Sequence, residues 1–149
     1  LPRIKPFYAV KCNPDELLVK TLAILGAGFD CASKNEISLV LDNTNIDASE
    51  IIFANPAKSD IHLRYARGVD VDLMTFDNIY ELLKIINYHP NAQLIVRIKV
   101  DDSHSVCKFN SKFGADLDNV DSLIYIADSS DSNYSFIHGY NFQVIAEKQ

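Results

Sequence analysis

The chain has 149 residues, about the length of one domain, and its 48% hydrophobic and 23% charged residues are typical of a globular protein, not of a disordered or collagen-like chain. Its formal net charge is -6 and its basic residues are scattered, so we expect no nucleic-acid partner. Its apolar runs fall far short of the roughly 20 residues that cross a bilayer, which excludes a membrane span. The 3 cysteines form no Cys-x-x-Cys pair, so they predict no metal site and favour buried, reduced thiols in a cytoplasmic protein.

Short apolar segments alternate with amphipathic ones along the chain. The apolar segments predict buried strands over residues 6–12, 28–32, 51–55, 71–76, 93–100 and 136–145. The predicted helix between the first two strands has Asn13 as its N-cap and an apolar face of Leu17, Leu18, Leu22 and Leu25. The later helices are predicted to begin at the capping box 33–36, at Ser59 or Asp60, at Asp77, and before the apolar positions Val120, Leu123, Ile124 and Ala127. The polar stretch 101–119 is interpreted as an active-site loop or a poorly ordered one.

Strands that alternate with helices predict a parallel sheet, and therefore an α/β fold. Such a sheet is either open and doubly wound or closed into a (β/α)8 barrel. No Gly-x-Gly-x-x-Gly follows any predicted strand, which disfavours a dinucleotide-binding sheet. The predicted strands fall two short of a barrel, and the chain begins at Leu1 without an initiator methionine, so we expect a piece of a longer chain.

Lys11 lies at the end of the first predicted strand, where alternation places it on the same face as Phe7 and Ala9. An ammonium group buried there must find a counter-charge or give up its proton. Only a neutral amine attacks an aldehyde to form an imine, so a buried lysine here favours imine chemistry. The alternative is a lysine whose side chain reaches past the strand end to water.

Two further charged residues, Asp30 and Arg97, lie near the carboxyl ends of the second and fifth predicted strands, where barrels build their sites. Each has a structural alternative, because Asp30 could cap a turn or pair with a lysine and Arg97 could be half of a buried ion pair. Together with Lys11 they favour an anionic, imine-forming ligand. Glu36 stays open between a structural role in the capping box and a direct contact with a cofactor.

The segments around these charges resemble the pyridoxal-phosphate-binding barrel domain of the eukaryotic ornithine decarboxylases. Two blocks are specific to that group, PFYAVKCN at residues 6–13 and FDCASKNE at 29–36. The resemblance covers most of the chain up to Phe142 and continues through IIFANP with the lysine at 58, MTFD, LIVRI and KFG at residues 51–58, 74–77, 94–98 and 112–114. It implies a partial (β/α)8 barrel of the alanine-racemase and ornithine-decarboxylase type, with about six βα units.

The resemblance also implies the cofactor, pyridoxal 5'-phosphate, and the residues that hold it. Lys11 is the lysine expected to form the imine with the cofactor, and Asp30, Glu36 and Arg97 are expected at the cofactor site. Lys112 is expected to bridge to the partner subunit of a homodimer.

The chain departs from the family near its end, where GYNFQVIAE at residues 139–147 replaces Gly-Val-Ser-Phe-His-Val-Gly-Ser-Gly. Gln143 stands where the family has a histidine stacked on the pyridine ring, and it is kept as a candidate cofactor contact although an amide cannot act as an imidazole. The glycine-rich turn that presents N–H groups to a phosphate is missing. We therefore expect a partial barrel domain at residues 1–142, a divergent tail at 143–149 and no C-terminal β domain.

The implied activity is the decarboxylation of ornithine to putrescine and carbon dioxide, a step of polyamine biosynthesis, with the isolated chain inactive. Two alternatives are a non-catalytic binding protein like the antizyme inhibitors, with antizyme as its partner, and a decarboxylase of the same group for another basic amino acid. A small single-domain barrel that carries the cofactor would need a phosphate loop of its own. Such binding proteins tend to lose the aspartate of the second block, so Asp30 and Lys11 favour the enzyme lineage.

Overall fold

The computed structural model describes residues 5–99, 113–129 and 136–141. Its strands are β1 (Phe7–Ala9), β2 (Gly28–Cys31), β3 (Ile51–Phe53), β4 (Leu73–Phe76), β5 (Gln93–Arg97) and β6 (Phe136–Asn141). Its helices are α1 (Glu16–Ile24), α2 (Lys34–Asn43), α3 (Asp60–Gly68), α4 (Ile79–Tyr88) and α5 (Leu117–Ser129), with 3-10 turns η1 (Val10–Cys12) and η2 (Ala48–Glu50). Within the described residues, no helix combines the length and the apolar character that a membrane crossing needs.

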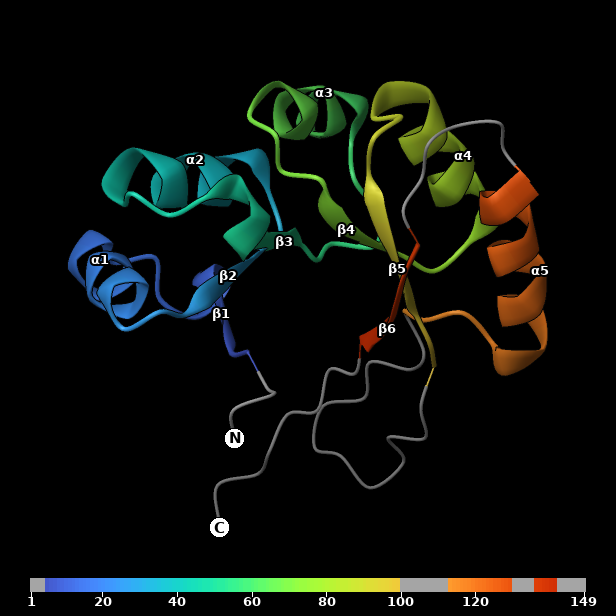
Figure 1. Ribbon diagram of the computed structural model, residues 1–149, viewed down its shortest axis with the longest axis horizontal. Helices are drawn as coiled ribbons and strands as arrows, with labels where there is room; N and C mark the ends of the chain where they lie inside the picture. Colours follow the sequence, from blue (N-terminus) through green and yellow to red (C-terminus); the bar gives the residue numbers. More distant parts are fainter. Residues whose placement is uncertain (1–4, 100–112, 130–135, 142–149) are drawn as a thin grey trace, which may run out of the picture.

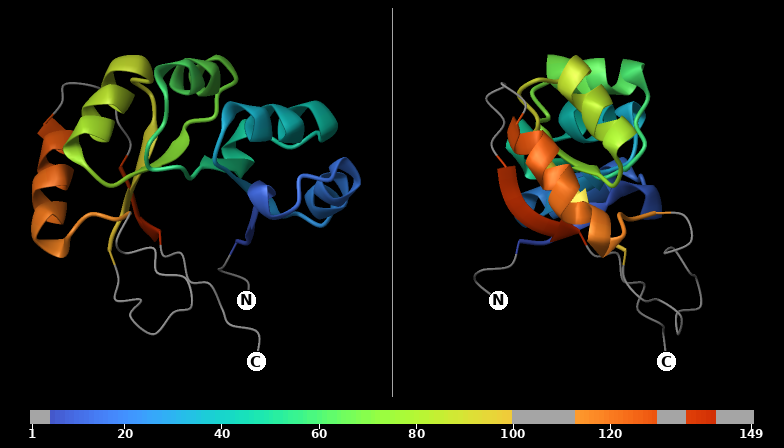
Figure 2. Two further views of the ribbon diagram at one scale, coloured as in Figure 1. Left: turned by 180° about the vertical axis from the view of Figure 1, so that it is seen from behind. Right: turned by 90° about the vertical axis from the view of Figure 1, so that its right-hand side faces the viewer.

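The strands form one sheet in the order β1-β2-β3-β4-β5-β6, and every neighbouring pair is parallel. The described helices lie side by side along the outer, convex side of this curved sheet (Figures 1 and 2). A doubly wound sheet reverses its strand order and carries helices on both faces, whereas a barrel keeps the chain order with helices outside. The predicted α/β fold and the partial barrel are therefore confirmed.

The hydrophobic core lies between the strands and the helices. Alternate strand residues belong to it, namely Phe29, Cys31, Ile51, Phe53, Met74, Phe76, Leu94 and Val96. Because successive side chains of a strand point to opposite faces, Asp30, Thr75 and Arg97 face the inner, concave side of the sheet. The sheet thus separates an apolar outer layer from an inner face that carries polar groups.

Two of the predicted helix starts are confirmed. The Ser33 hydroxyl accepts a hydrogen bond from the Glu36 N–H at 3.3 Å at the start of α2, and the Ser59 hydroxyl accepts one from the His62 N–H at 3.4 Å at the start of α3. A serine side chain at the N-cap satisfies an amide that has no partner inside the helix. These local pairings depend only on residues three apart, which is why the sequence predicts them.

The other two N-caps were predicted one or two residues too early. At α1, Asn13 accepts from the Asp15 N–H at 3.2 Å, and this turn presents Asp15, whose carboxylate accepts from the Leu18 N–H at 2.9 Å. At α4 the cap is Asn78, whose side chain accepts from the Glu81 N–H at 3.0 Å. Because Asn78 caps α4, the side chain of the preceding residue, Asp77, is available for other contacts.

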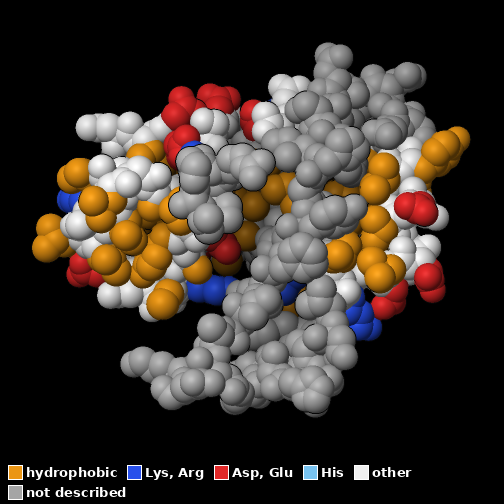
Figure 3. All heavy atoms as spheres, turned by 60° about the horizontal axis from the view of Figure 1, so that its bottom comes forward, with side chains coloured by type: hydrophobic (Ala, Val, Ile, Leu, Met, Phe, Trp, Pro, Cys, Tyr) orange, Lys and Arg blue, Asp and Glu red, His pale blue; other side chains and the backbone are white. Residues whose placement is uncertain are grey.

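The predicted apolar face of α1 is only partly buried. Val19 is fully buried, but Leu17 and Leu25 are 73% and 75% exposed, because α1 packs on α2 and lies at the end of the described helix row. Figure 3, in which the bottom of Figure 1 is turned forward, shows hydrophobic side chains over much of the described surface of that face.

The strands and the predicted loop also end earlier than expected. β1 ends at Ala9, β3 at Phe53 and β5 at Arg97, because each backbone turns into its connection once the pairing with its neighbour stops. α5 begins at Leu117, so the last three residues of the predicted loop 101–119 are helical. Residues 101–112 lie outside the described part of the chain.

Candidate functional site

Lys11 lies just beyond the carboxyl end of β1, within the turn η1. Val10, two residues after Tyr8, is fully buried in the core, where strand alternation would also place it, although its backbone already belongs to η1. β1 ends at Ala9, so Lys11 lies in the turn that follows and not on the strand as predicted, and the face that its side chain shares stays a prediction. Lys11 is also exposed, so the described residues do not bury its ammonium group as the sequence argument expected.

Asp30 is the residue on which the predicted site residues converge. It is half-buried on β2, in register with Ala9 of β1, and therefore lies near the turn that carries Lys11. Burial raises the pKa of the Asp30 carboxyl, the charge of Glu36 raises it further, and the charges of Lys11 and Arg97 oppose that rise. The structure thus brings Lys11, Glu36 and Arg97 within electrostatic reach of one carboxyl group.

Glu36 fastens the loop that follows β2. Its Oε2 accepts a hydrogen bond from the Ala32 N–H at 2.8 Å, one residue before the N-cap Ser33. The carboxylate thus serves the same purpose as in a capping box, displaced by one residue. This contact holds the backbone that follows Asp30, and a direct contact with the cofactor stays a prediction.

Arg97 ends β5 and is only 7% exposed. Its guanidinium carbon lies 5.0 Å from the centre of the Phe113 ring, within cation–π range. Burial lowers the pKa of Arg97, and the charges of Asp77 and Asp30 oppose that fall. A buried cation between two carboxylates fits the structural alternative of an ion-pair partner as well as that of an anion-binding residue, so its role stays a prediction.

Asp77 is a site residue that the sequence argument assigned wrongly, as a helix cap. Its Oδ2 accepts a hydrogen bond from the Gly114 N–H at 2.9 Å, and its Oδ1 accepts one from Asn78 Nδ2 at 2.8 Å. The Ala115 N–H also donates to the Arg97 carbonyl at 2.8 Å. These bonds fasten Gly114 and Ala115 to the ends of β4 and β5. The pattern that could have indicated this is Asp77 directly before Asn78, because only one of two adjacent cap residues can cap the helix.

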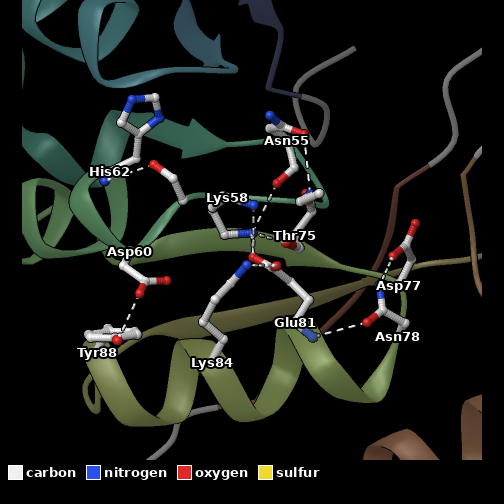
Figure 4. A network of polar contacts seen from close by, with 12 residues as sticks. Asn55, Lys58, Asp60, His62, Thr75, Asp77, Asn78, Glu81, Lys84 and Tyr88 are labelled. Atoms are coloured by element: carbon white, nitrogen blue, oxygen red, sulfur yellow. Dashed lines mark hydrogen bonds and ion pairs between the residues drawn. The ribbon is translucent and has the colours of Figure 1, made fainter.

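A buried ion pair also lies among the loops at this end of the sheet, and the sequence argument missed it. Lys58 Nζ lies 3.1 Å from Glu81 Oε1, and the two side chains are 0% and 3% exposed (Figure 4). Burial lowers the pKa of Lys58 to about 8, and the charge of Glu81 opposes that fall. The family block that contains Lys58 was the one feature of the sequence that drew attention to it.

The remaining sequence candidates divide between buried, exposed and undescribed positions. Cys31 is buried as expected, and burial raises the pKa of its thiol, whereas Cys12 is exposed, against the prediction. Lys112, Gln143 and Cys107 lie outside the described residues. Within the described ranges, no group of three or more His, Cys, Asp or Glu residues is placed to hold a metal ion.

The site offers three complementary groups at one end of the sheet. Lys11 brings an accessible primary amine, Asp30 a carboxyl group that binds protons more readily than usual, and Arg97 a buried guanidinium. An amine reacts with an aldehyde, and a guanidinium binds an anion. The described residues therefore fit a cofactor that is both an aldehyde and an anion, as pyridoxal phosphate is.

Comparisons with known proteins agree with this chemistry. The family model described as "Pyridoxal-dependent decarboxylase, pyridoxal binding domain" matches residues 1–137. The ornithine decarboxylase of Neurospora crassa is 55% identical over 127 residues, which is 85% of this chain and 26% of that protein. The ornithine decarboxylase of Schizosaccharomyces pombe is 46% identical over 144 residues, which is 97% of this chain and 32% of that protein. Antizyme inhibitor 2 of Xenopus laevis is 51% identical over 127 residues, or 85% of this chain and 28% of that protein.

Solved structures of the same kind superpose closely. The arginine decarboxylase of Paramecium bursaria Chlorella virus, bound to agmatine, matches with a TM-score of 0.87 and 41% identity over 94% of this chain and 37% of that one. The ornithine decarboxylase of Entamoeba histolytica matches with a TM-score of 0.81 and 33% identity over 97% of this chain and 38% of that one. The chain thus spans about a quarter to a third of the length of the first curated relatives that it matches. The chain belongs to the pyridoxal-dependent decarboxylase family and corresponds to its pyridoxal-binding domain.

Proposed function

We propose that this chain is the cofactor-binding part of a pyridoxal-phosphate-dependent decarboxylase that converts ornithine to putrescine and carbon dioxide in polyamine biosynthesis. The observation that supports this most is the identity of 46% to 55% with curated ornithine decarboxylases across most of the chain. The grouping of Lys11, Glu36 and Arg97 around Asp30 supports the cofactor assignment independently.

Each site residue has a role that follows from its position. Lys11 supplies the amine that anchors the aldehyde, since it is accessible at the rim of the sheet beside Asp30. Asp30 places a half-buried carboxyl group, whose pKa is raised by burial, near that amine. Arg97 supplies a fixed positive charge on the inner face, where water has little access to screen it. When bound, the cofactor supplies the electron sink that decarboxylation requires.

The proposal also includes what the family resemblance implies for the whole protein. It takes residues 1–142 as part of the cofactor barrel, with the phosphate-binding turn and the substrate-reading residues supplied from outside this chain. It includes a cytoplasmic homodimer, with Lys112 at the interface. The effect of Gln143 at the position of a stacking histidine belongs to the same proposal.

A second candidate is a binding protein that acts without catalysis. The match to antizyme inhibitor 2 of Xenopus laevis supports it, and antizyme would then be the partner. Lys11 and Asp30 favour the enzyme, because a protein that does not use the cofactor has no need for an amine near a half-buried carboxyl group. The two candidates differ in a measurable way, since only the enzyme releases carbon dioxide.

The test is a substrate comparison on the protein that carries this chain, expressed at its natural length with pyridoxal phosphate. Ornithine, arginine and lysine labelled at the carboxyl carbon are supplied separately, and the released carbon dioxide is counted. Release from ornithine above the other two supports the proposal. Preference for arginine or lysine reassigns the substrate, and no release from any of them, with tight binding to antizyme, supports the second candidate.

A further inference from the structure

We propose that Lys58 is a positioning residue, which holds the loops after β2, β3 and β4 in place and so fixes Asp30 relative to Arg97 at the carboxyl end of the sheet. The inference rests on the proposed function, because it concerns the same cofactor site. It adds a residue that touches neither the expected cofactor nor the group of charges around Asp30.

Lys58 makes three contacts that join three separate elements. Its Nζ donates to the Asn55 carbonyl at 2.9 Å, in the loop after β3, and to the Thr75 carbonyl at 2.6 Å, on β4. Its third partner is Glu81 of α4, at 3.1 Å. Figure 4 shows these partners converging on the one ammonium group from different sides. An ammonium group has three donors, and here each one has an acceptor.

From Lys58 the polar contacts continue toward Asp30. Asn55 donates through Nδ2 to the Ala32 carbonyl at 3.2 Å, and the Ala32 N–H is held by Glu36 at 2.8 Å. Ala32 follows directly on the end of β2, two residues after Asp30. The loop that bears Asn55 therefore supports the backbone next to the candidate site.

In the other direction the contacts lead toward Arg97. Glu81 also accepts from the Lys58 N–H at 3.1 Å, and the Glu81 N–H donates to Asn78 at 3.0 Å. Asn78 donates to Asp77, and Asp77 accepts from Gly114, whose neighbour Ala115 is bonded to the Arg97 carbonyl. We call this series of contacts from Glu36 to Gly114 the rim network.

Lys58 lies at the centre of the rim network, where its side chain and its backbone N–H connect the two halves. A hydrophobic contact would tolerate sliding, whereas three hydrogen bonds to an ammonium group fix both distance and direction. Loss of the Lys58 side chain leaves each half intact and leaves the bond from the N–H of residue 58 to Glu81, which alone holds the two halves less firmly than the side chain does. Asp30 and Arg97 would then stand at a less constant separation.

The variants are chosen to separate positioning from stability. Lys58→Met removes the donors but leaves Glu81 buried without its main partner, which destabilises the fold. The double variant Lys58→Met with Glu81→Gln removes both charges and keeps the volume, so it leaves no unpaired buried carboxylate, and its remaining loss of stability comes from the Asn55 and Thr75 carbonyls, which lose a donor. Lys84→Met is the matched control, because Lys84 also pairs with Glu81, at 2.7 Å, but is more exposed and joins no second loop.

Two quantities are measured on the protein that carries this chain, at its natural length. The first is the Kd for pyridoxal phosphate, from a fluorescence titration. The second is amide hydrogen exchange in the peptides that contain Ala32 and Gly114, which lie at opposite ends of the rim network and report on it without any cofactor. Unfolding midpoints are recorded for every variant, so that a loss of stability is recognised as such.

We expect the double variant to bind pyridoxal phosphate about 10- to 100-fold more weakly and to exchange faster at both peptides, with Lys84→Met unchanged in both. Unchanged affinity together with unchanged exchange in the double variant would overturn the role of Lys58. If the unsubstituted protein binds no pyridoxal phosphate, the proposed function fails, and the exchange data alone then decide: faster exchange at both peptides supports the positioning role, and unchanged exchange overturns it.

Discussion

Substitution of Gly114 by alanine should detach residues 113–115 from the end of β5. Gly114 has a φ of +100°, in the region that favours glycine, and a Cβ there would lie 2.8 Å from the Lys99 nitrogen and 2.9 Å from the Ile98 carbonyl carbon. Both atoms belong to the backbone and cannot rotate away. The segment itself must therefore move, and Phe113 moves with it from its place beside Arg97.

The expected cost has two parts. Placing alanine at a positive φ costs about 1–2 kcal/mol. Displacement of the segment removes the hydrogen bonds from the Gly114 N–H to Asp77 and from the Ala115 N–H to the Arg97 carbonyl, each of which stabilises by about 0.5–1.5 kcal/mol. The local structure should therefore lose about 2–5 kcal/mol of stability.

Hydrogen exchange at the amides of β5, measured under native conditions, gives the free energy of local opening. Two other glycines serve as controls. Gly26 has a φ of +82° and open space around it, so Gly26→Ala shows the cost of the backbone conformation alone. Gly68 has open space and no such φ, so Gly68→Ala should cost nothing. If Gly114→Ala costs no more than Gly26→Ala, the close approach to the end of β5 is not what requires glycine.

Three further predictions concern the site, the pH dependence and the isolated chain. Arg97→Met should weaken retention of pyridoxal phosphate, measured by titration, and normal binding with normal turnover would make Arg97 purely structural. Burial lowers the pKa of His89 in the folded protein. As the pH falls below about 6.5, the His89 imidazole therefore binds a proton in the unfolded state before it does so in the folded state. The free energy of unfolding should thus fall as the pH is lowered from about 6.5 to the folded-state pKa of His89. In His89→Gln, the free energy of unfolding measured with urea should depend less steeply on pH. An unchanged dependence on pH would contradict this. The 149-residue chain alone should associate on size-exclusion chromatography, because it exposes large apolar side chains. It should release no carbon dioxide from ornithine, because the glycine-rich turn that binds a phosphate is replaced in its sequence. An active monomer would refute both expectations.

The sequence predicted the order of the elements and the class of fold because those depend on local patterns. Strand alternation, the caps at Ser33 and Ser59, and the spacing of apolar residues involve neighbours within a few positions. The resemblance of two short blocks was enough to indicate the family. Lys11, Asp30, Glu36 and Arg97 were all selected before the structure brought them together.

What the sequence could not predict depends on contacts between distant residues. Glu81 lies 23 positions from Lys58, and Gly114 lies 37 positions from Asp77, so no local pattern pairs them. Lys11 was expected on the first strand itself, but β1 ends at Ala9 and Lys11 lies in the 3-10 turn that follows, a change of backbone conformation that strand periodicity does not reveal. The exposure of Leu17 reflects how few neighbours α1 has among the described residues, which its own sequence does not encode.

Lys11 is proposed to anchor the cofactor. The measurement is borohydride reduction of the protein with bound pyridoxal phosphate, at its natural length, followed by digestion and identification of the modified peptide. Reduction makes the bond between a lysine and the aldehyde permanent, so the modified residue marks the anchor. We expect the label on Lys11, the lysine that follows β1 and lies near Asp30. Label on Lys34 or Lys58, with Lys11 unmodified, would contradict it.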